Sequence, residues 1–205
     1  PNRVVDAARG LLMHLPGPAC AALLGQAAGG HDMDRSPVWE KLDAWLQEEL
    51  DGRESIRRRR VLLEQASRLP DTPAHNRALA RACALAMKPN FSSCTVAPGC
   101  GDKVLIRQVF LPQQITAEIQ QLWPTVLAML RGGRITHLRP LLDTVRAWAF
   151  PRSQAGGNHV TEEYAQEMRM FATRMLADLA SLSVAGAALR RWVDDGRTAP
   201  CSARW

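Results

Sequence analysis

The sequence predicts an all-α protein, an irregular bundle of about eight helices joined by one long loop. Ala, Leu and Arg dominate the chain of 205 residues, and only 5% of the residues are aromatic, a mixture that favours helix over sheet. Apolar residues recur at helical spacing, and proline and glycine clusters separate these periodic segments. No run of about 18 apolar residues occurs, so no membrane span is predicted.

Two helices are predicted before residue 31. The apolar residues between Val4 and Leu15 follow helical spacing, and the Pro16-Gly17-Pro18 cluster ends this helix. A second, Ala-rich helix runs from about Ala19 to the paired glycines Gly29-Gly30.

Three helices follow, of which the first and third have clear start signals. Ser36-Pro37 combines an N-cap serine with a proline in the first turn, and Asp51-Gly52 ends that helix. The next helix spans about Arg53 to Leu69, and its arginines at 57–60 are expected mostly on a solvated face. Thr72-Pro73 repeats the capped start of a helix that runs to about Lys88.

Residues 89–103 form the long stretch without a periodic pattern, and such connections tend to be functional. Val104 to Leu111 is compatible with a short strand or a helical turn. Ile115 to Leu130 then predicts a helix that ends at Gly132-Gly133. Pro124 lies within it and is expected to kink the helix or break it in two.

The C-terminal part continues with three predicted helices. Leu138 to Trp148 is amphipathic and ends before Pro151. Thr161 caps the longest helix, whose apolar stripe from Tyr164 to Leu182 is interpreted as core. A last helix carries Leu189, Trp192 and Val193.

Two regions are expected from this pattern. Residues 1–150 form a helical domain that carries the 89–103 loop. Residues 151–205 form a C-terminal helical segment that packs on this domain or folds as a small subdomain. The chain begins with Pro1 and shows no signal peptide, which indicates a piece of a longer protein.

The net charge of +6 suits a nucleic acid or an acidic protein partner. Much of it comes from Arg57-Arg58-Arg59-Arg60, but no aromatic or glycine-rich recognition motif accompanies this run. Nucleic-acid binding is therefore the least favoured of the functions considered.

The five cysteines are odd in number and irregular in spacing, which argues against a disulfide framework and favours reduced thiols. His75, Cys83, Cys94 and Cys100 do not match a standard zinc spacing, so no metal and no cofactor are predicted. The sequence also lacks the GxSxG, P-loop and HExxH patterns of common hydrolases and nucleotide-binding proteins.

The strongest candidate site is the stretch Cys100-Gly101-Asp102-Lys103-Val104 within and just after the predicted loop. The thiolate is the nucleophilic form of cysteine, and a free thiol holds its proton up to a pKa of about 8.5. Asp102 can accept a proton or steer an incoming amine, and Lys103 favours the anion. The pattern predicts Cys100 and Asp102 as catalytic residues, with Cys94 as the alternative reactive thiol.

This stretch resembles the NEL ("novel E3 ligase") domain of the bacterial IpaH/SspH-type effector ubiquitin ligases, an all-α family with a Cys-x-Asp motif followed by a basic and an apolar residue. The similarity extends loosely over residues 36–150. It includes Trp39 to Leu46 upstream, and Gly133-Arg134 with the following paired leucines downstream.

The resemblance implies an E3 ubiquitin ligase that acts after secretion, in the host cytoplasm; a protein that is not an effector is expected in the cytoplasm. Cys100 would accept ubiquitin from an E2 enzyme as a thioester, and Asp102 would assist the attack of a lysine of a host protein. Lys103 and Arg134 are the binding candidates.

The competing interpretation is a non-catalytic helical module for protein interaction or scaffolding within a larger signalling or effector protein. Amphipathic helices and the absence of a second catalytic group favour it. In that case Cys100 is an incidental or buried thiol, and Asp102 caps the following element.

Overall fold

The computed structural model describes residues 16–29, 36–47, 52–89, 115–151 and 162–182. The helices with defined ends are α2 (Pro16–Gly29), α3 (Pro37–Gln47), α4 (Gly52–Ser67), α5 (Pro73–Ala86), α7 (Trp123–Arg131), α8 (Arg139–Ala149) and α9 (Glu162–Ala180). Residues 115–120 form a further helical stretch before α7. No strand occurs among the described residues, so the predicted all-α class is confirmed for them.

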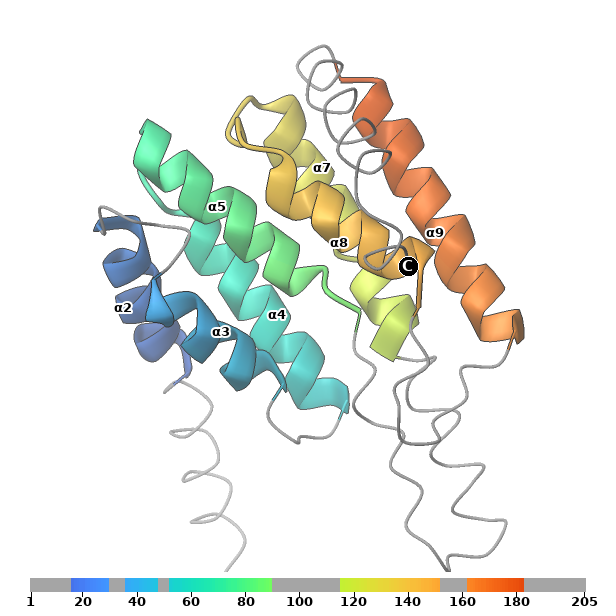
Figure 1. The fold of residues 1–205 in the computed structure, drawn as a ribbon. Coiled ribbons are helices and arrows are strands. Elements are labelled where there is room, and N and C mark those ends of the chain that lie inside the picture. The colour runs from blue at the N-terminus through green and yellow to red at the C-terminus, as the bar shows by residue number, and fades with distance from the viewer. Residues whose placement is uncertain (1–15, 30–35, 48–51, 90–114, 152–161, 183–205) are drawn as a thin grey trace, which may run out of the picture.

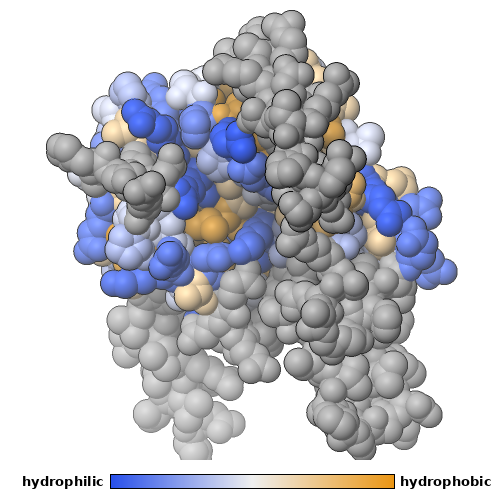
Figure 2. All heavy atoms as spheres, in the orientation of Figure 1, coloured by the Kyte–Doolittle hydropathy of each residue, from blue (hydrophilic) through white to orange (hydrophobic). Residues whose placement is uncertain are grey.

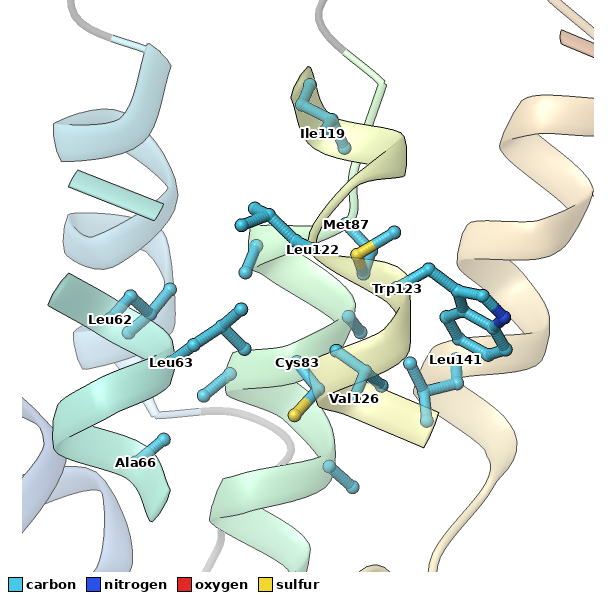
Figure 3. Close-up of a cluster of buried hydrophobic side chains, with 14 of the residues drawn as sticks. Leu62, Leu63, Ala66, Cys83, Met87, Ile119, Leu122, Trp123, Val126 and Leu141 are labelled. Carbon is cyan, nitrogen blue, oxygen red and sulfur yellow. The ribbon is translucent and has the colours of Figure 1, made fainter. Parts of the chain in front are cut away.

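Helices α4 and α5 occupy the middle of the arrangement in Figure 1. Helices α2 and α3 pack on one side of this pair. On the other side, α8 packs against α5, and α9 packs against α8. A single hydrophobic core runs through all of these helices. Figure 3 shows part of it, where Leu62 and Leu63 of α4, Cys83 of α5 and Val126 of α7 lie in one cluster.

Two predicted capped starts are found in the structure. Helix α3 begins at Pro37, and the Val38 N–H donates to Ser36 Oγ over 3.4 Å. Helix α5 begins at Pro73, and the His75 N–H donates to the hydroxyl of the extended N-cap residue Thr72 over 3.3 Å. Each hydroxyl accepts a bond from an N–H that has no partner within its helix.

The predicted start of the second helix is wrong. Helix α2 begins at Pro16, so Pro16 and Pro18 lie in its first turn and do not precede it. Proline is tolerated there because the first N–H groups of a helix have no intrahelical carbonyl partner.

The predicted break near Pro124 is confirmed. A turn follows residues 115–120, and α7 starts at Trp123 with Pro124 in its first turn. Helix α7 ends in a Schellman motif, in which Gly133 has a φ of 71° and its N–H donates to Leu130 O over 3.1 Å. The Arg134 N–H completes the motif with a bond of 3.0 Å to Met129 O.

The predicted outward orientation of the arginine run is wrong for Arg59, whose side chain is 0% exposed. Arg60 is exposed, as expected. The reason lies in the helical register, because Arg59 follows the buried Ile56 by one turn and precedes the buried Leu63 by another. It therefore shares the face of α4 that packs into the core.

Other predicted elements fall outside the described residues. They are the helix before Leu15, the loop beyond Pro89, the Val104–Leu111 segment and the helix around Trp192.

Candidate functional site

Three of the four predicted site residues, Cys100, Asp102 and Lys103, lie outside the described residues, as does the alternative thiol Cys94. The structure describes the two ends between which this segment runs. The first is the C-terminal end of α5, which continues to the buried Pro89, and the second is the helical stretch that begins at Ile115. In Figures 1 and 3 these two ends lie on neighbouring elements.

The C-terminal end of α5 is capped by a side chain from α4. The last carbonyls of a helix have no intrahelical partner, and a cation there also interacts favourably with the helix dipole. The cation here is the Arg59 guanidinium. Its Nη1 donates to the carbonyl oxygens of Leu85, Ala86 and Lys88 over 3.3, 2.6 and 2.8 Å.

Helix α8 supplies two more donors to the same end. The Thr144 hydroxyl donates to Ala84 O over 3.1 Å, and the Trp148 indole N–H donates to Met87 O over 2.7 Å. Every carbonyl from residue 84 to residue 88 thus accepts a hydrogen bond from a side chain of α4 or α8. These hydrogen bonds hold the backbone at the C-terminal end of α5 against α4 and α8.

An ion pair with α3 adds a further contact at this end. Lys88 Nζ lies 2.9 Å from Asp43 Oδ2, and both side chains are partly exposed, so the pair is a weak one. Asp43 also acts on Arg59. Burial lowers the pKa of Arg59 to about 10, and the charge of Asp43 opposes this shift. Arg59 is therefore still a cation at neutral pH.

The second end is held against α9. Thr116 is 1% exposed, and its hydroxyl lies 2.5 Å from the hydroxyl of Tyr164 in a buried hydrogen bond. Ile115 and Ile119 are buried in the core on either side of this contact. Both described ends of the 90–114 segment are therefore joined to helices far away in the sequence.

Arg134, the one predicted binding residue that the structure describes, contacts the end of α4. Its Nη2 donates to Leu69 O over 2.6 Å, and its Nη1 donates to Ser67 O over 3.3 Å. A short turn joins α4 to α5, so these carbonyls lie beside the N-terminal end of α5. With 14 residues in α5, that end is about 20 Å from the exit at Pro89.

The two described cysteines, Cys20 and Cys83, are buried and reduced. Burial raises the pKa of Cys20 to about 11 and that of Cys83 to about 12. Figure 3 shows Cys83 inside the apolar cluster between α4 and α7. Both remain neutral thiols at neutral pH and function as small core residues.

We predict that iodoacetamide at pH 8 leaves Cys20 and Cys83 unmodified in the folded chain, because the reagent needs an accessible thiolate. The measurement is mass spectrometry of tryptic peptides after labelling with and without urea. The urea sample provides the control, since both peptides should be modified there. Modification of Cys83 in the folded chain, at the rate found in urea, would contradict the buried position.

Arg59, Thr144 and Trp148 were not predicted as parts of the site. The only sequence signal for Arg59 is its register with Ile56 and Leu63 on the apolar face of α4. No sequence motif identifies Thr144 or Trp148 as a cap of α5, because each donates to a backbone carbonyl of another helix.

No family model matches the chain, and no curated protein or solved structure matches it either. Among the described residues, no group of three or more His, Cys, Asp or Glu side chains is arranged to hold a metal ion. None of the described helices combines the length and the apolar character needed to cross a membrane.

Proposed function

We propose that this chain is an E3 ubiquitin ligase domain that carries ubiquitin as a thioester on Cys100 and transfers it to a lysine of a protein substrate. The observation that carries the proposal is the sequence motif Cys100-Gly101-Asp102-Lys103. On either side of it in the sequence, the described residues up to Pro89 and from Ile115 are hydrogen-bonded to helices of the core, which supports the proposal. Cys20 and Cys83 do not compete for this role, because both are buried with raised pKa values.

The first step is thiol exchange. The Cys100 thiolate attacks the carbonyl carbon of the thioester that joins ubiquitin to the E2 cysteine. A new C–S bond forms to Cys100, the C–S bond to the E2 sulfur breaks, and that sulfur leaves as a thiolate that takes a proton from water. No oxidant or reductant is needed.

The second step is attack by the substrate lysine. Its ammonium group must lose a proton before the nitrogen can attack, and Asp102 accepts that proton. The C–N bond of the product then forms, the C–S bond to Cys100 breaks, and the remaining extra proton on nitrogen passes to solvent. Cys100 returns to its thiolate form.

The surface of the molecule is compatible with protein partners. In the view of Figure 2, hydrophilic residues cover most of the described surface, with smaller apolar patches among them. The net charge of +6 favours association with acidic faces of an E2 enzyme or a substrate.

The test is incubation with E1, ubiquitin, ATP and a panel of E2 enzymes, followed by gels with and without reducing agent. We expect a ubiquitin adduct that disappears on reduction and is absent in Cys100→Ala. Cys94→Ala is the matched control, because it removes the neighbouring thiol and should keep the adduct.

Two results would contradict the proposal. If no E2 enzyme yields an adduct, the chain is better explained as a non-catalytic interaction module. If the adduct is lost in Cys94→Ala and kept in Cys100→Ala, the thioester forms on Cys94.

A further inference from the structure

Helices α5, α7 and α8 carry an excess of positive charge. Residues 73–89 and 123–151, which contain these helices, include seven lysine or arginine residues and a single acidic residue, Asp143. Helix α9, which packs on α8, instead carries four acidic and two basic residues. The described arginine side chains of α4 are either paired with glutamate or, like Arg59, buried. The excess of positive charge is therefore a local property of one part of the molecule.

Five of these cations lie on the outer sides of two adjacent helices. The exposed or partly exposed positions of α5 recur at helical spacing and continue to the residue after Met87, and those of α8 recur in the same way. In Figure 1, α5 and α8 lie in front of α4 and α7, so both outer sides face the viewer. The cations on them, together called the α5/α8 face, are Arg77, Arg81, Lys88, Arg139 and Arg146.

Hydrogen bonds between the two helices fix their relative position. The Thr144 hydroxyl donates to Ala84 O, and the Trp148 N–H donates to Met87 O. Helices α5 and α8 therefore run in the same direction, and residues that differ by about 60 in number lie at the same level. At 1.5 Å per residue, the cations of α5 extend over about 16 Å of helix, and those of α8 lie beside them.

The α5/α8 face also offers one acceptor and some apolar surface. Asp143 is exposed, and its Oδ1 lies 3.3 Å from Arg139 Nε. Leu85 and Ala147 are partly exposed on the same two outer sides. Figure 2, drawn in the orientation of Figure 1, shows a smaller apolar patch among hydrophilic residues on this side of the molecule.

An extended peptide with acidic and apolar side chains fits this composition. Its carboxylates can pair with the arginines in bidentate geometry, and its apolar side chains can contact Leu85 and Ala147. A peptide N–H can donate to Asp143, whereas a nucleic-acid backbone has no such donor and its phosphates are repelled by this carboxylate. About five residues of extended chain are enough to span about 16 Å.

We propose that the α5/α8 face binds an acidic segment of a partner protein in an extended conformation. The attraction is between the cations of α5 and α8 and the carboxylates of the partner, so it is expected to weaken with salt. This inference goes beyond the proposed function and does not depend on Cys100, because every residue it uses lies on α5 or α8 or directly after α5.

The test is fluorescence anisotropy with the full chain and a labelled ten-residue peptide that contains eight glutamates and two leucines. We expect saturable binding at low salt. The matched peptide with glutamine in place of every glutamate should bind at least about tenfold more weakly, because it keeps the apolar side chains and loses the charge.

Two charge reversals locate the binding surface. Arg77→Glu on α5 and Arg146→Glu on α8 should each raise the dissociation constant of the acidic peptide at least about fivefold, since an attraction becomes a repulsion. Arg174→Glu is the matched control, because it makes the same change in net charge at an exposed position of α9. It should stay within about twofold of the parent. Circular dichroism checks that each variant is folded, and Arg77→Glu decides if Arg146→Glu is not, because Arg77 is exposed and its replacement costs little stability.

Three outcomes overturn the proposal. The first is the absence of binding by the acidic peptide at low salt. The second is equal weakening in Arg174→Glu, which shows an effect of net charge alone. The third is a labelled single-stranded DNA of the same charge that binds more tightly than the peptide and is weakened by Arg77→Glu, which assigns the face to a nucleic acid. The assay contains no E1 or E2 enzyme, so a failure of the ligase proposal leaves this inference intact.

Discussion

Replacing Trp148 by alanine is expected to lower the free energy of unfolding by about 3–5 kcal/mol, because it removes a large side chain from a packed core. Trp148 is 0% exposed. Its ring makes an edge contact with Phe171 at 4.9 Å between centroids, and its N–H donates to Met87 O over 2.7 Å. The variant therefore leaves a cavity between α8 and α9 and an unpaired carbonyl at the end of α5.

Urea denaturation followed by circular dichroism measures this loss. Trp148→Phe keeps one aromatic ring but loses the N–H and part of the indole, so a smaller loss than for alanine, about 1–3 kcal/mol, is expected for it. Met170→Ala, at a position that is 68% exposed, should change the free energy of unfolding by less than about 0.5 kcal/mol. A Trp148→Ala variant no less stable than Met170→Ala would contradict the packing described above.

The second large effect concerns Asp102. Under the proposed function, transfer of ubiquitin from Cys100 to lysine is expected to fall by about 10²–10⁴-fold in Asp102→Asn, because the amide cannot accept the proton of the lysine ammonium. Loading of Cys100 from E2 should change little, since that step involves no amine. The measurement is single-turnover discharge of purified, ubiquitin-loaded protein to free lysine.

Hydroxylamine provides a matched acceptor for this variant. It is already unprotonated at neutral pH, so it needs no general base, and its reaction with the loaded Asp102→Asn protein should proceed at nearly the parent rate. Raising the pH should also partly restore discharge to lysine, because more of the amine is then neutral. Equal slowing with both acceptors would show that Asp102 does not act as the proton acceptor.

Much of the fold could be predicted because its helix boundaries are encoded locally. Thr72-Pro73 predicts the start of α5, and Gly132-Gly133 predicts the end of α7, as the structure has them. Pro124 lies at the predicted break before α7. The start of α2 at Pro16 was not predicted because a proline cluster fits the first turn of one helix as well as the end of another.

The candidate site was harder to predict, for a different physical reason. Cys100, Asp102 and Lys103 come from a local motif, and their roles remain predictions. Arg59 and Trp148 act through backbone carbonyls of another helix, which become neighbours only after the chain has folded. A four-arginine run is typical of a solvated surface, and the register of Arg59 with Ile56 was the sole indication otherwise.

Arg134 shows that a residue which contributes to a sequence resemblance can have a structural role. The Gly133-Arg134 step was interpreted as part of a resemblance to a ligase family. In the structure, Gly133 supplies the positive φ of the α7 stop, and Arg134 caps the end of α4. Backbone geometry alone is a sufficient reason for this pair of residues.

The capped end of α5 also has a consequence for how the chain folds. Arg59 of α4 precedes the carbonyls it binds by 26 to 29 residues. Thr144 and Trp148 of α8 follow theirs by about 60 residues. The last turn of α5 therefore cannot be completed until α4 and α8 have both docked, which requires the α4–α5 hairpin to form and the chain between α5 and α8 to close a loop of about 60 residues. Helices before and after the 90–114 segment are thereby coupled into one cooperative folding unit, in which neither half reaches its final form alone.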